Sequence, residues 1–60
     1  MKVKVRLLER GRIVSKTYCN IAYVSWQDDI VILVPNIGSK TIKITFRKEM
    51  VVAVVEERGP

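Results

Sequence analysis

The chain has 60 residues, a formal net charge of +5, one cysteine and no histidine. A chain of this length forms a single domain, residues 1–60, with a small core. The lone cysteine excludes an internal disulfide and favours a reducing cytoplasm, and without histidine the chain lacks the commonest general base and metal ligand. We therefore expect a protein that is not an enzyme and that holds neither a metal ion nor a cofactor.

Valine and isoleucine together supply 17 residues, and these β-branched side chains suit a pleated sheet better than a helix. The composition predicts an all-β fold, a single small antiparallel barrel or strongly curled sheet of five to six strands. The longest apolar runs, residues 30–34 and 50–55, are shorter than the apolar part of a secretory signal, about 7 to 15 residues, or a membrane span of about 20. We accordingly expect a cytoplasmic protein with no membrane partner.

Residues 1–7 read M-K-V-K-V-R-L, a strict alternation of basic and apolar residues. Gly11 then closes a hairpin, either in a two-residue turn with Arg10 or in a three-residue turn with a bulge. The two turns shift the strand pairing by one residue, and the sequence leaves both open. The alternation predicts a half-buried strand with Val3, Val5 and Leu7 inward and with Lys2, Lys4 and Arg6 in an outward row.

Residues 12–18 are predicted to form an edge strand, because Ser15, Lys16 and Thr17 interrupt the apolar residues. Residues 20–26 read N-I-A-Y-V-S-W, which is typical of a strand, and the stretch Q-D-D that follows predicts a turn. In a regular strand, Ile21 and Tyr23 would lie on one face and Ala22, Val24 and Trp26 on the other.

The run I-V-I-L-V at residues 30–34 predicts a fourth strand, which ends at Pro35 because proline has no amide hydrogen to donate. Residues 36–39 carry turn chemistry. After them, residues 41–46 alternate with Ile42, Ile44 and Phe46 inward and with Thr41, Lys43 and Thr45 outward.

A polar connection, R-K-E at residues 47–49, is either a turn or a single helical turn. Residues 50–56 follow as a strand, since four valines favour a strand over the helical alternative. Residues 57–60 are expected to be a frayed tail.

The apolar runs at residues 30–34 and 50–55 break the alternation that a sheet with one solvated face should have. If alternate residues of the first run fill the core, the others point outward, and a short chain has no helix to cover them. A second copy of the chain is the simplest cover. The alternative is a monomer with single valines exposed at bends. The residues predicted for self-association are Val31, Leu33, Val52 and Val54.

Six of the eleven basic residues lie among the first 16 residues, beside one acidic residue, Glu9. This asymmetry favours a polyanionic partner, and exposed aromatic rings could stack on bases. We predict a non-enzymatic nucleic-acid-binding protein that contacts the backbone of DNA or RNA. The alternative is a homo-oligomeric interaction module whose basic row serves solubility only. The predicted phosphate contacts are Lys2, Lys4, Arg6, Arg12 and Lys16, and the candidate stacking residues are Tyr18, Tyr23, Trp26 and Phe46.

The stretch K-V-K-V-R-L, the glycine hairpin and the following strands with Trp26 together resemble the small basic β-barrels of SH3-like or Sm-like type. The connection R-K-E before V-V-A-V-V is similar to the short turn and closing strand of such barrels. The resemblance covers most of the chain and implies a barrel fold. Because W-Q-D-D does not match the Asp and Asn pair of the Sm-like RNA-contacting loop, it implies no site residues in this chain. The chain also resembles short β-proteins of phages and mobile elements, which implies that the alternative interaction module is encoded by such an element.

Overall fold

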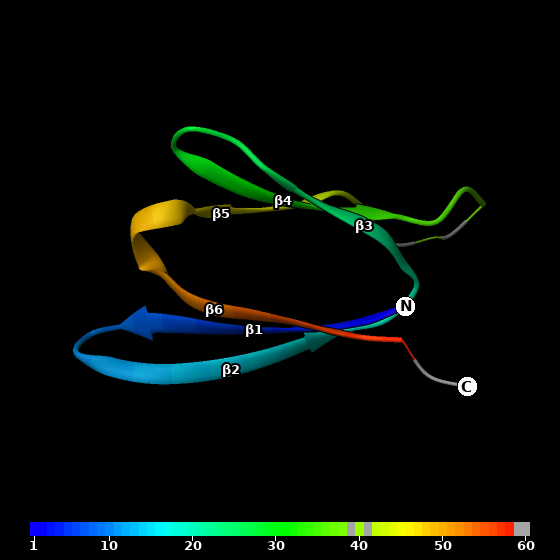
Figure 1. Cartoon of the computed structure of the whole chain (residues 1–60). Coiled ribbons are helices and arrows are strands. Elements are labelled where there is room, and N and C mark those ends of the chain that lie inside the picture. Colours follow the sequence, from blue (N-terminus) through cyan, green and yellow to red (C-terminus); the bar gives the residue numbers. More distant parts are fainter. Residues whose placement is uncertain (39, 41, 59–60) are drawn as a thin grey trace.

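The computed structural model describes residues 1–38, 40 and 42–58. They form two three-stranded antiparallel sheets, β2-β1-β6 and β3-β4-β5, which we call the lower and the upper sheet from their places in Figure 1. The all-β prediction is confirmed, but the strand pairing of the described residues does not close a barrel. The elements are β1 (Lys2–Glu9), β2 (Arg12–Tyr18), β3 (Ile21–Trp26), β4 (Ile30–Pro35), β5 (Ile44–Arg47), the 3-10 helix η1 (Lys48–Met50) and β6 (Val51–Glu57).

The hairpin of β1 and β2 closes through a two-residue turn. Glu9 pairs with Arg12, and the two residues between them, Arg10 and Gly11, have φ angles of 50° and 75°. Positive φ at both central positions belongs to a type I′ turn, whose twist matches that of the paired strands. The structure thus selects one of the two registers that the sequence leaves open. The predicted edge position of β2 is confirmed, because β1 is its one neighbour in the lower sheet.

A bulge in β3 changes the faces that the sequence predicted for this strand. The pairing with β4 shifts between Ile21 and Tyr23, which leaves Ala22 as an extra residue. Ile21 is buried, Tyr23 is exposed, and Val24 packs against the core. The prediction that Ile21 and Tyr23 share a face is therefore wrong, since one extra residue reverses the alternation of side chains beyond it.

β4 is the central strand of the upper sheet, and its apolar run is covered largely by the chain itself. Val31 and Leu33 are completely buried, and Leu33 belongs to the core cluster. Ile32 points to the opposite face, where Ser25 and Thr45 flank it on the neighbouring strands, and it is also buried. Both faces of this strand are therefore shielded without a helix.

β5 is shorter than predicted and begins at Ile44. Its pairing with β4 ends at the pair of Leu33 and Ile44, so residue 42 has no neighbouring strand. Ile42 was expected to face the core, but it is 79% exposed, and that prediction is wrong. Ser39 and Thr41, which fall in the predicted turn and strand, lie outside the described residues.

The segment after β5 follows the prediction closely. The 3-10 helix η1 supplies the helical turn that was one option for the connection, and β6 is a strand rather than a helix. β6 pairs with β1, with a shift between Arg6 and Leu7 that makes Val52 an extra residue. Of the predicted tail, Glu57 ends β6, and residues 59–60 lie outside the described part of the chain.

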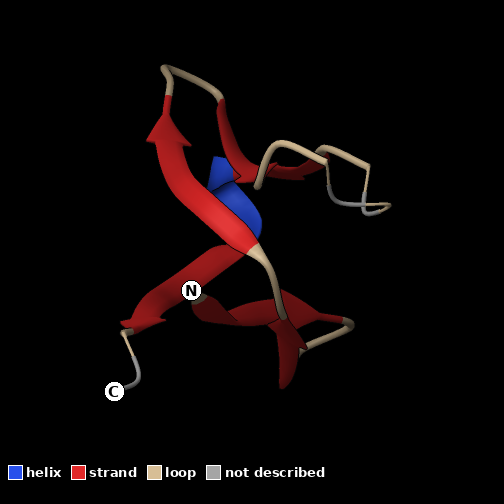
Figure 2. Ribbon diagram, turned by 90° about the vertical axis from the view of Figure 1, so that its right-hand side faces the viewer, coloured by secondary structure: helices blue, strands red, loops and turns tan. Residues whose placement is uncertain are grey.

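Two hydrogen bonds link the sheets at the N-terminal end of the molecule. The Met1 amino group donates to the Ile21 carbonyl oxygen at 2.7 Å, and the Ile21 amide donates to the Met1 carbonyl oxygen at 3.0 Å. The Lys48 amide donates to the Asp29 carbonyl oxygen at 2.8 Å and extends the β4–β5 ladder of the upper sheet by one bond beyond the pair of Ile30 and Arg47. Figure 2 shows the layers from the N-terminal end, where the connection from β2 to β3 crosses from one sheet to the other.

The core lies between the two sheets. The rings of Tyr18 and Phe46 pack beside it, with centroids 5.9 Å apart and planes tilted by 59°, a geometry that aromatic pairs favour. The buried core cluster consists of Val3, Val5, Leu7, Ile21 and Leu33, which confirms the predicted inward face of β1.

No helix in the described part of the chain is long and apolar enough to cross a membrane.

Candidate nucleic-acid interface

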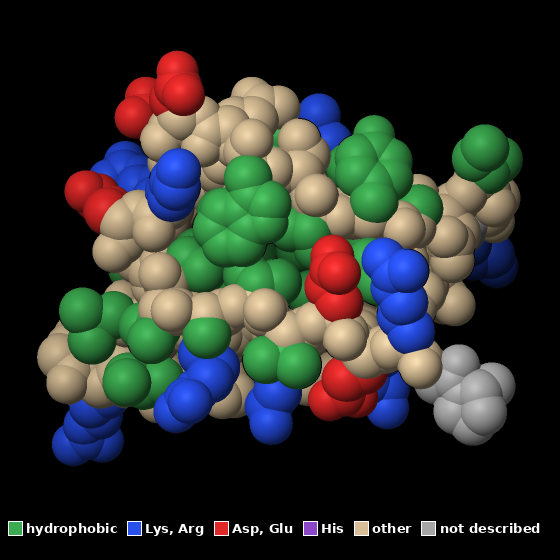
Figure 3. All heavy atoms as spheres, viewed as in Figure 1, with side chains coloured by type: hydrophobic (Ala, Val, Ile, Leu, Met, Phe, Trp, Pro, Cys, Tyr) green, Lys and Arg blue, Asp and Glu red, His purple; other side chains and the backbone are tan. Residues whose placement is uncertain are grey.

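The outer face of the lower sheet carries a row of basic residues along its central strand. Because β1 alternates strictly, Lys2, Lys4 and Arg6 are exposed on the side opposite the core. Alternate residues of a strand lie about 7 Å apart, which keeps three cations on one line. Figure 3 shows Lys and Arg side chains projecting from the side of the lower sheet that faces away from the upper sheet. We call this surface the cationic face.

The cross-strand neighbours of Lys4 and Arg6 are neutral, whereas Lys2 has an acidic neighbour. Lys4 lies between Thr17 on β2 and Val55 on β6. Arg6 lies between Ser15 on β2 and Ala53 on β6, whereas Lys2 lies opposite the acidic Glu57. Directly opposite residues of an antiparallel pair have Cβ atoms about 5 Å apart, so Ser15 and Thr17 add hydroxyl groups beside the cations.

The cations of this face are not used in ion pairs within the described residues. The ion pairs found there join Lys16 to Glu9 at 3.4 Å, Arg47 to Glu49 at 3.9 Å and Arg58 to Glu56 at 3.8 Å. None of these pairs includes a member of the basic row. The excess charge at Lys4 and Arg6 is therefore available to an anionic partner, with Lys2 partly compensated by the nearby Glu57.

Arg12 and Lys16 lie on the neighbouring strand, as predicted, but not on the cationic face. The two-residue turn places Lys16 opposite Val5 and Arg12 opposite Glu9, and paired residues of a sheet point to the same side. Both side chains therefore lie on the face of β2 that is directed toward the core. Lys16 forms an ion pair with Glu9 there and does not lie beside the basic row. Sequence reasoning missed Ser15 and Thr17, which only the correct hairpin register brings beside the basic row.

The four aromatic residues do not join the basic row. Tyr18 and Phe46 pack beside the core. Tyr23 and Trp26 are more than half exposed, but both belong to β3 in the upper sheet. The cationic face therefore has no aromatic ring among the described residues on which a base could stack.

The residues predicted for self-association occupy different environments. Val31 and Leu33 are completely buried in the single chain and offer no surface to a partner, because the alternation of β4 points them into the core. Val54 is half-buried and packs against the core cluster. Val52, the extra residue of the bulge in β6, is 50% exposed. Self-association itself stays a prediction. Of the four residues predicted for it, Val52 on β6 is the one that is exposed to a partner.

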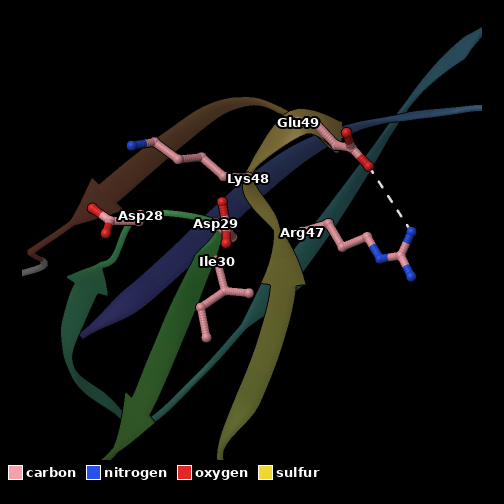
Figure 4. Close-up of a pocket in the computed structure, with 6 residues that line it drawn as sticks. All are labelled: Asp28, Asp29, Ile30, Arg47, Lys48 and Glu49. Carbon is pink, nitrogen blue, oxygen red and sulfur yellow. Dashed lines mark ion pairs between the residues drawn. The ribbon is translucent and has the colours of Figure 1, made fainter.

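A second feature is the hollow of about 550 Å³ between the β3–β4 turn and η1. Figure 4 shows the residues that line it, with Arg47 paired to Glu49 and Lys48 extending away from that pair. Asp28 and Asp29 are exposed. Adjacent acidic residues with basic residues around them do not form a converging carboxylate pair, and no group of three possible metal ligands occurs among the described residues.

Cys19 is exposed and forms no disulfide. Comparison of the chain with protein-family models, curated proteins and solved structures found no match. The features of this chain that bear on its function are therefore the cationic face and the edges of the sheets.

Proposed function

We propose that this chain is a non-enzymatic protein that binds the phosphate backbone of nucleic acid through the cationic face. The observation that carries the proposal is the position of Lys4 and Arg6, exposed on one face, flanked by neutral residues and outside the ion pairs of the described residues. Each cation that neutralises a phosphate releases counterions, which makes such binding favourable at low salt.

The chemistry of the face favours backbone contacts over base recognition. Ser15 and Thr17 can donate hydrogen bonds to phosphate oxygens, as small hydroxyl side chains commonly do. Base-specific readout requires side chains that enter a groove, and single-strand binding without sequence preference usually needs aromatic platforms. The cationic face has neither in its described residues, so we infer little sequence preference and no advantage for single strands.

The proposal is tested by titrating labelled duplex DNA, duplex RNA and single strands with the protein at several salt concentrations. We expect duplex affinity to fall linearly on a log–log plot against salt, by about 0.9 per phosphate neutralised. The double variant Lys4→Gln, Arg6→Gln should lower that slope by about 1.8.

The matched control is Lys43→Gln, Lys48→Gln, which removes the same charge from exposed positions near the upper sheet. This control variant should keep a slope of log affinity against log salt close to that of the wild type, because it removes no cation from the cationic face. A small change from its lower net charge is expected. Equal losses in both double variants would mean that total charge alone drives binding, and no binding at low salt would reject the function.

We further propose that the two sheets form an open version of an SH3-like barrel. In support, the chain order is a hairpin, a three-stranded meander, a single 3-10 turn and a strand that returns to β1. The hydrogen bonds between Met1 and Ile21 join the two layers at one end, and η1 carries the chain from β5 to β6 at the other. Backbone NMR contacts between β3 and β6, or between β2 and β5, would demonstrate closure, and their absence would leave a two-layered sandwich.

We also propose that the protein acts in the cytoplasm, where nucleic acid is available and an exposed thiol such as Cys19 stays reduced. Labelling the thiol in intact cells with and without a prior reducing step tests this. A Cys19 that reacts only after reduction would contradict a cytoplasmic location.

A further inference from the structure

The two edges of the lower sheet differ in how well they are protected against pairing with another chain. β2 forms one edge and carries Arg12 and Lys16. β6 forms the other, and residues 51–55 on it carry no charge, with Val52 and Val55 about half exposed. Natural proteins usually blunt free edge strands with charges, because an unpaired strand recruits other strands. β6 lacks this protection over five residues.

The edges of the upper sheet do not show the same combination. β5 carries Arg47 near its end. β3 has no charged residue, but its first residue, Ile21, is already hydrogen bonded to Met1 on the side that faces β1. The edge of β3 is therefore occupied at one end, whereas the free edge of β6 is uncharged from Val51 to Val55 and has no hydrogen-bond partner among the described residues. Figure 3 shows hydrophobic side chains exposed on this side of the molecule, along the seam between the sheets and on the lower sheet.

The backbone groups of β6 alternate between β1 and the free edge. In a two-residue hairpin the residues that flank the turn, Glu9 and Arg12, form a hydrogen-bonded pair. Counting back along β1, Lys4 and Arg6 then direct their backbone groups toward β6. Their partners Val55 and Ala53 bond to β1, so Val54 and Glu56 present their N–H and C=O groups at the free edge.

We propose that two copies of this chain associate by antiparallel pairing of their β6 strands about a twofold axis near Val54. The charge pattern of the strand favours this orientation. Glu56 and Glu57 lie at its C-terminal end, and the N-terminal end is apolar. Antiparallel pairing places the acidic end of each copy beside the apolar end of the other, whereas parallel pairing would place like charges side by side.

The pairing would produce one continuous six-stranded sheet, in the order β2-β1-β6-β6-β1-β2. A twofold axis perpendicular to a sheet keeps its faces, so both rows of Lys2, Lys4 and Arg6 lie on the same surface, separated by the neutral residues of the two β6 strands. This consequence rests on the proposed function, since it joins two cationic faces into one longer phosphate-binding surface. The association itself does not depend on nucleic acid.

The test is sedimentation equilibrium of the free protein up to about 1 mM, the weak end of specific association. We expect a mass that rises from 6.9 kDa to twice that value. In the proposed dimer residue 52 of each copy lies opposite Glu56 of the other copy, so Val52→Glu should hold the protein at the monomer mass, because it places like charges side by side. Ile13→Glu, at an equally exposed position on β2, is the matched control and should still dimerise.

A wild-type protein that stays monomeric over this range, or a dimer that Val52→Glu leaves intact, would overturn the pairing of β6. Circular dichroism of both variants checks that they keep their strands. The nucleic-acid titration separates the two proposals: a dimer that binds no duplex at low salt rejects the proposed function alone, and a monomer that binds duplex rejects the association alone. Weaker duplex binding by Val52→Glu than by Ile13→Glu would support the joined surface, since Ile13 lies opposite Leu8 on the cationic face itself and its change of charge alone should already weaken binding.

Discussion

Arg6 lies directly opposite Ser15 on the outer face of the lower sheet. The two-residue turn at Arg10 and Gly11 sets this relationship, because a turn longer by one residue would send Ser15 to the other face and bring Lys16 in its place. The length of the turn at the hairpin tip therefore determines which side chains of β2 lie beside Lys4 and Arg6.

The register can be tested by placing a negative charge next to Arg6. Ser15→Asp should weaken duplex binding by about tenfold at low salt, because a carboxylate opposite Arg6 competes with phosphate. The control, Tyr23→Asp, makes the same change of charge at an exposed position of the upper sheet. Fluorescence anisotropy with a labelled duplex measures both, and equal losses would contradict the placement of Ser15 on the cationic face.

Lys16→Gln should leave duplex binding close to the wild-type value, although Lys16 was predicted from the sequence to contact phosphate. Its side chain pairs with Glu9 at 3.4 Å, on the face of β2 opposite the basic row. Both side chains are more than 40% exposed, so the loss of this pair should lower the free energy of unfolding by less than about 1 kcal/mol. A loss of salt slope as large as that caused by Arg6→Gln would show that Lys16 belongs to the interface.

The turn itself makes a prediction about stability. Gly11 has a φ of 75°, so Gly11→Ala should lower the free energy of unfolding by about 1 to 2 kcal/mol, since a Cβ is unfavourable in the left-handed region. Arg10, at φ 50°, carries the same kind of strain, and Arg10→Asn should relieve part of it. Urea titration followed by circular dichroism measures both variants. An Arg10→Asn variant less stable than wild type would argue against the type I′ turn.

Leu33 was predicted from the sequence to contact a second copy of the chain, but its burial predicts that it stabilises the fold of the single chain. Leu33→Ala should reduce the free energy of unfolding by about 2 to 5 kcal/mol, because the side chain is completely buried. Leu8→Ala is the matched control, since Leu8 is exposed on the outer face of β1 and should cost far less. Thermal unfolding at low protein concentration measures both. A Leu33→Ala variant with unchanged stability would mean that Leu33 lies on a surface after all.

Much of the fold could be predicted because its strands are short and strongly patterned. β1 shows strict alternation, and its buried and exposed residues are those expected. The edge position of β2, the turn before β4 and the strand character of β6 also follow from local chemistry: interrupted apolar pattern, acidic turn residues and a run of valines.

The errors come from features that local patterns do not encode. The bulge at Ala22 reverses one face of β3, and the early end of the β4–β5 pairing leaves Ile42 outside the sheet. Both depend on how strands meet across the molecule. The candidate site was predicted in part for the same reason: Lys2, Lys4 and Arg6 share one strand, whereas the relation of that strand to Lys16 depends on a register that the sequence leaves open.

The pairing of β1 with β6 joins the first and last of the described strands. Contacts between distant segments form late, because a long loop must close before they contribute, and proteins dominated by such contacts fold slowly. During synthesis, the local hairpins can form on the ribosome, but the lower sheet stays incomplete until β6 has been made. The cationic face, which is built on that sheet, should therefore mature after the hairpins and after the upper sheet.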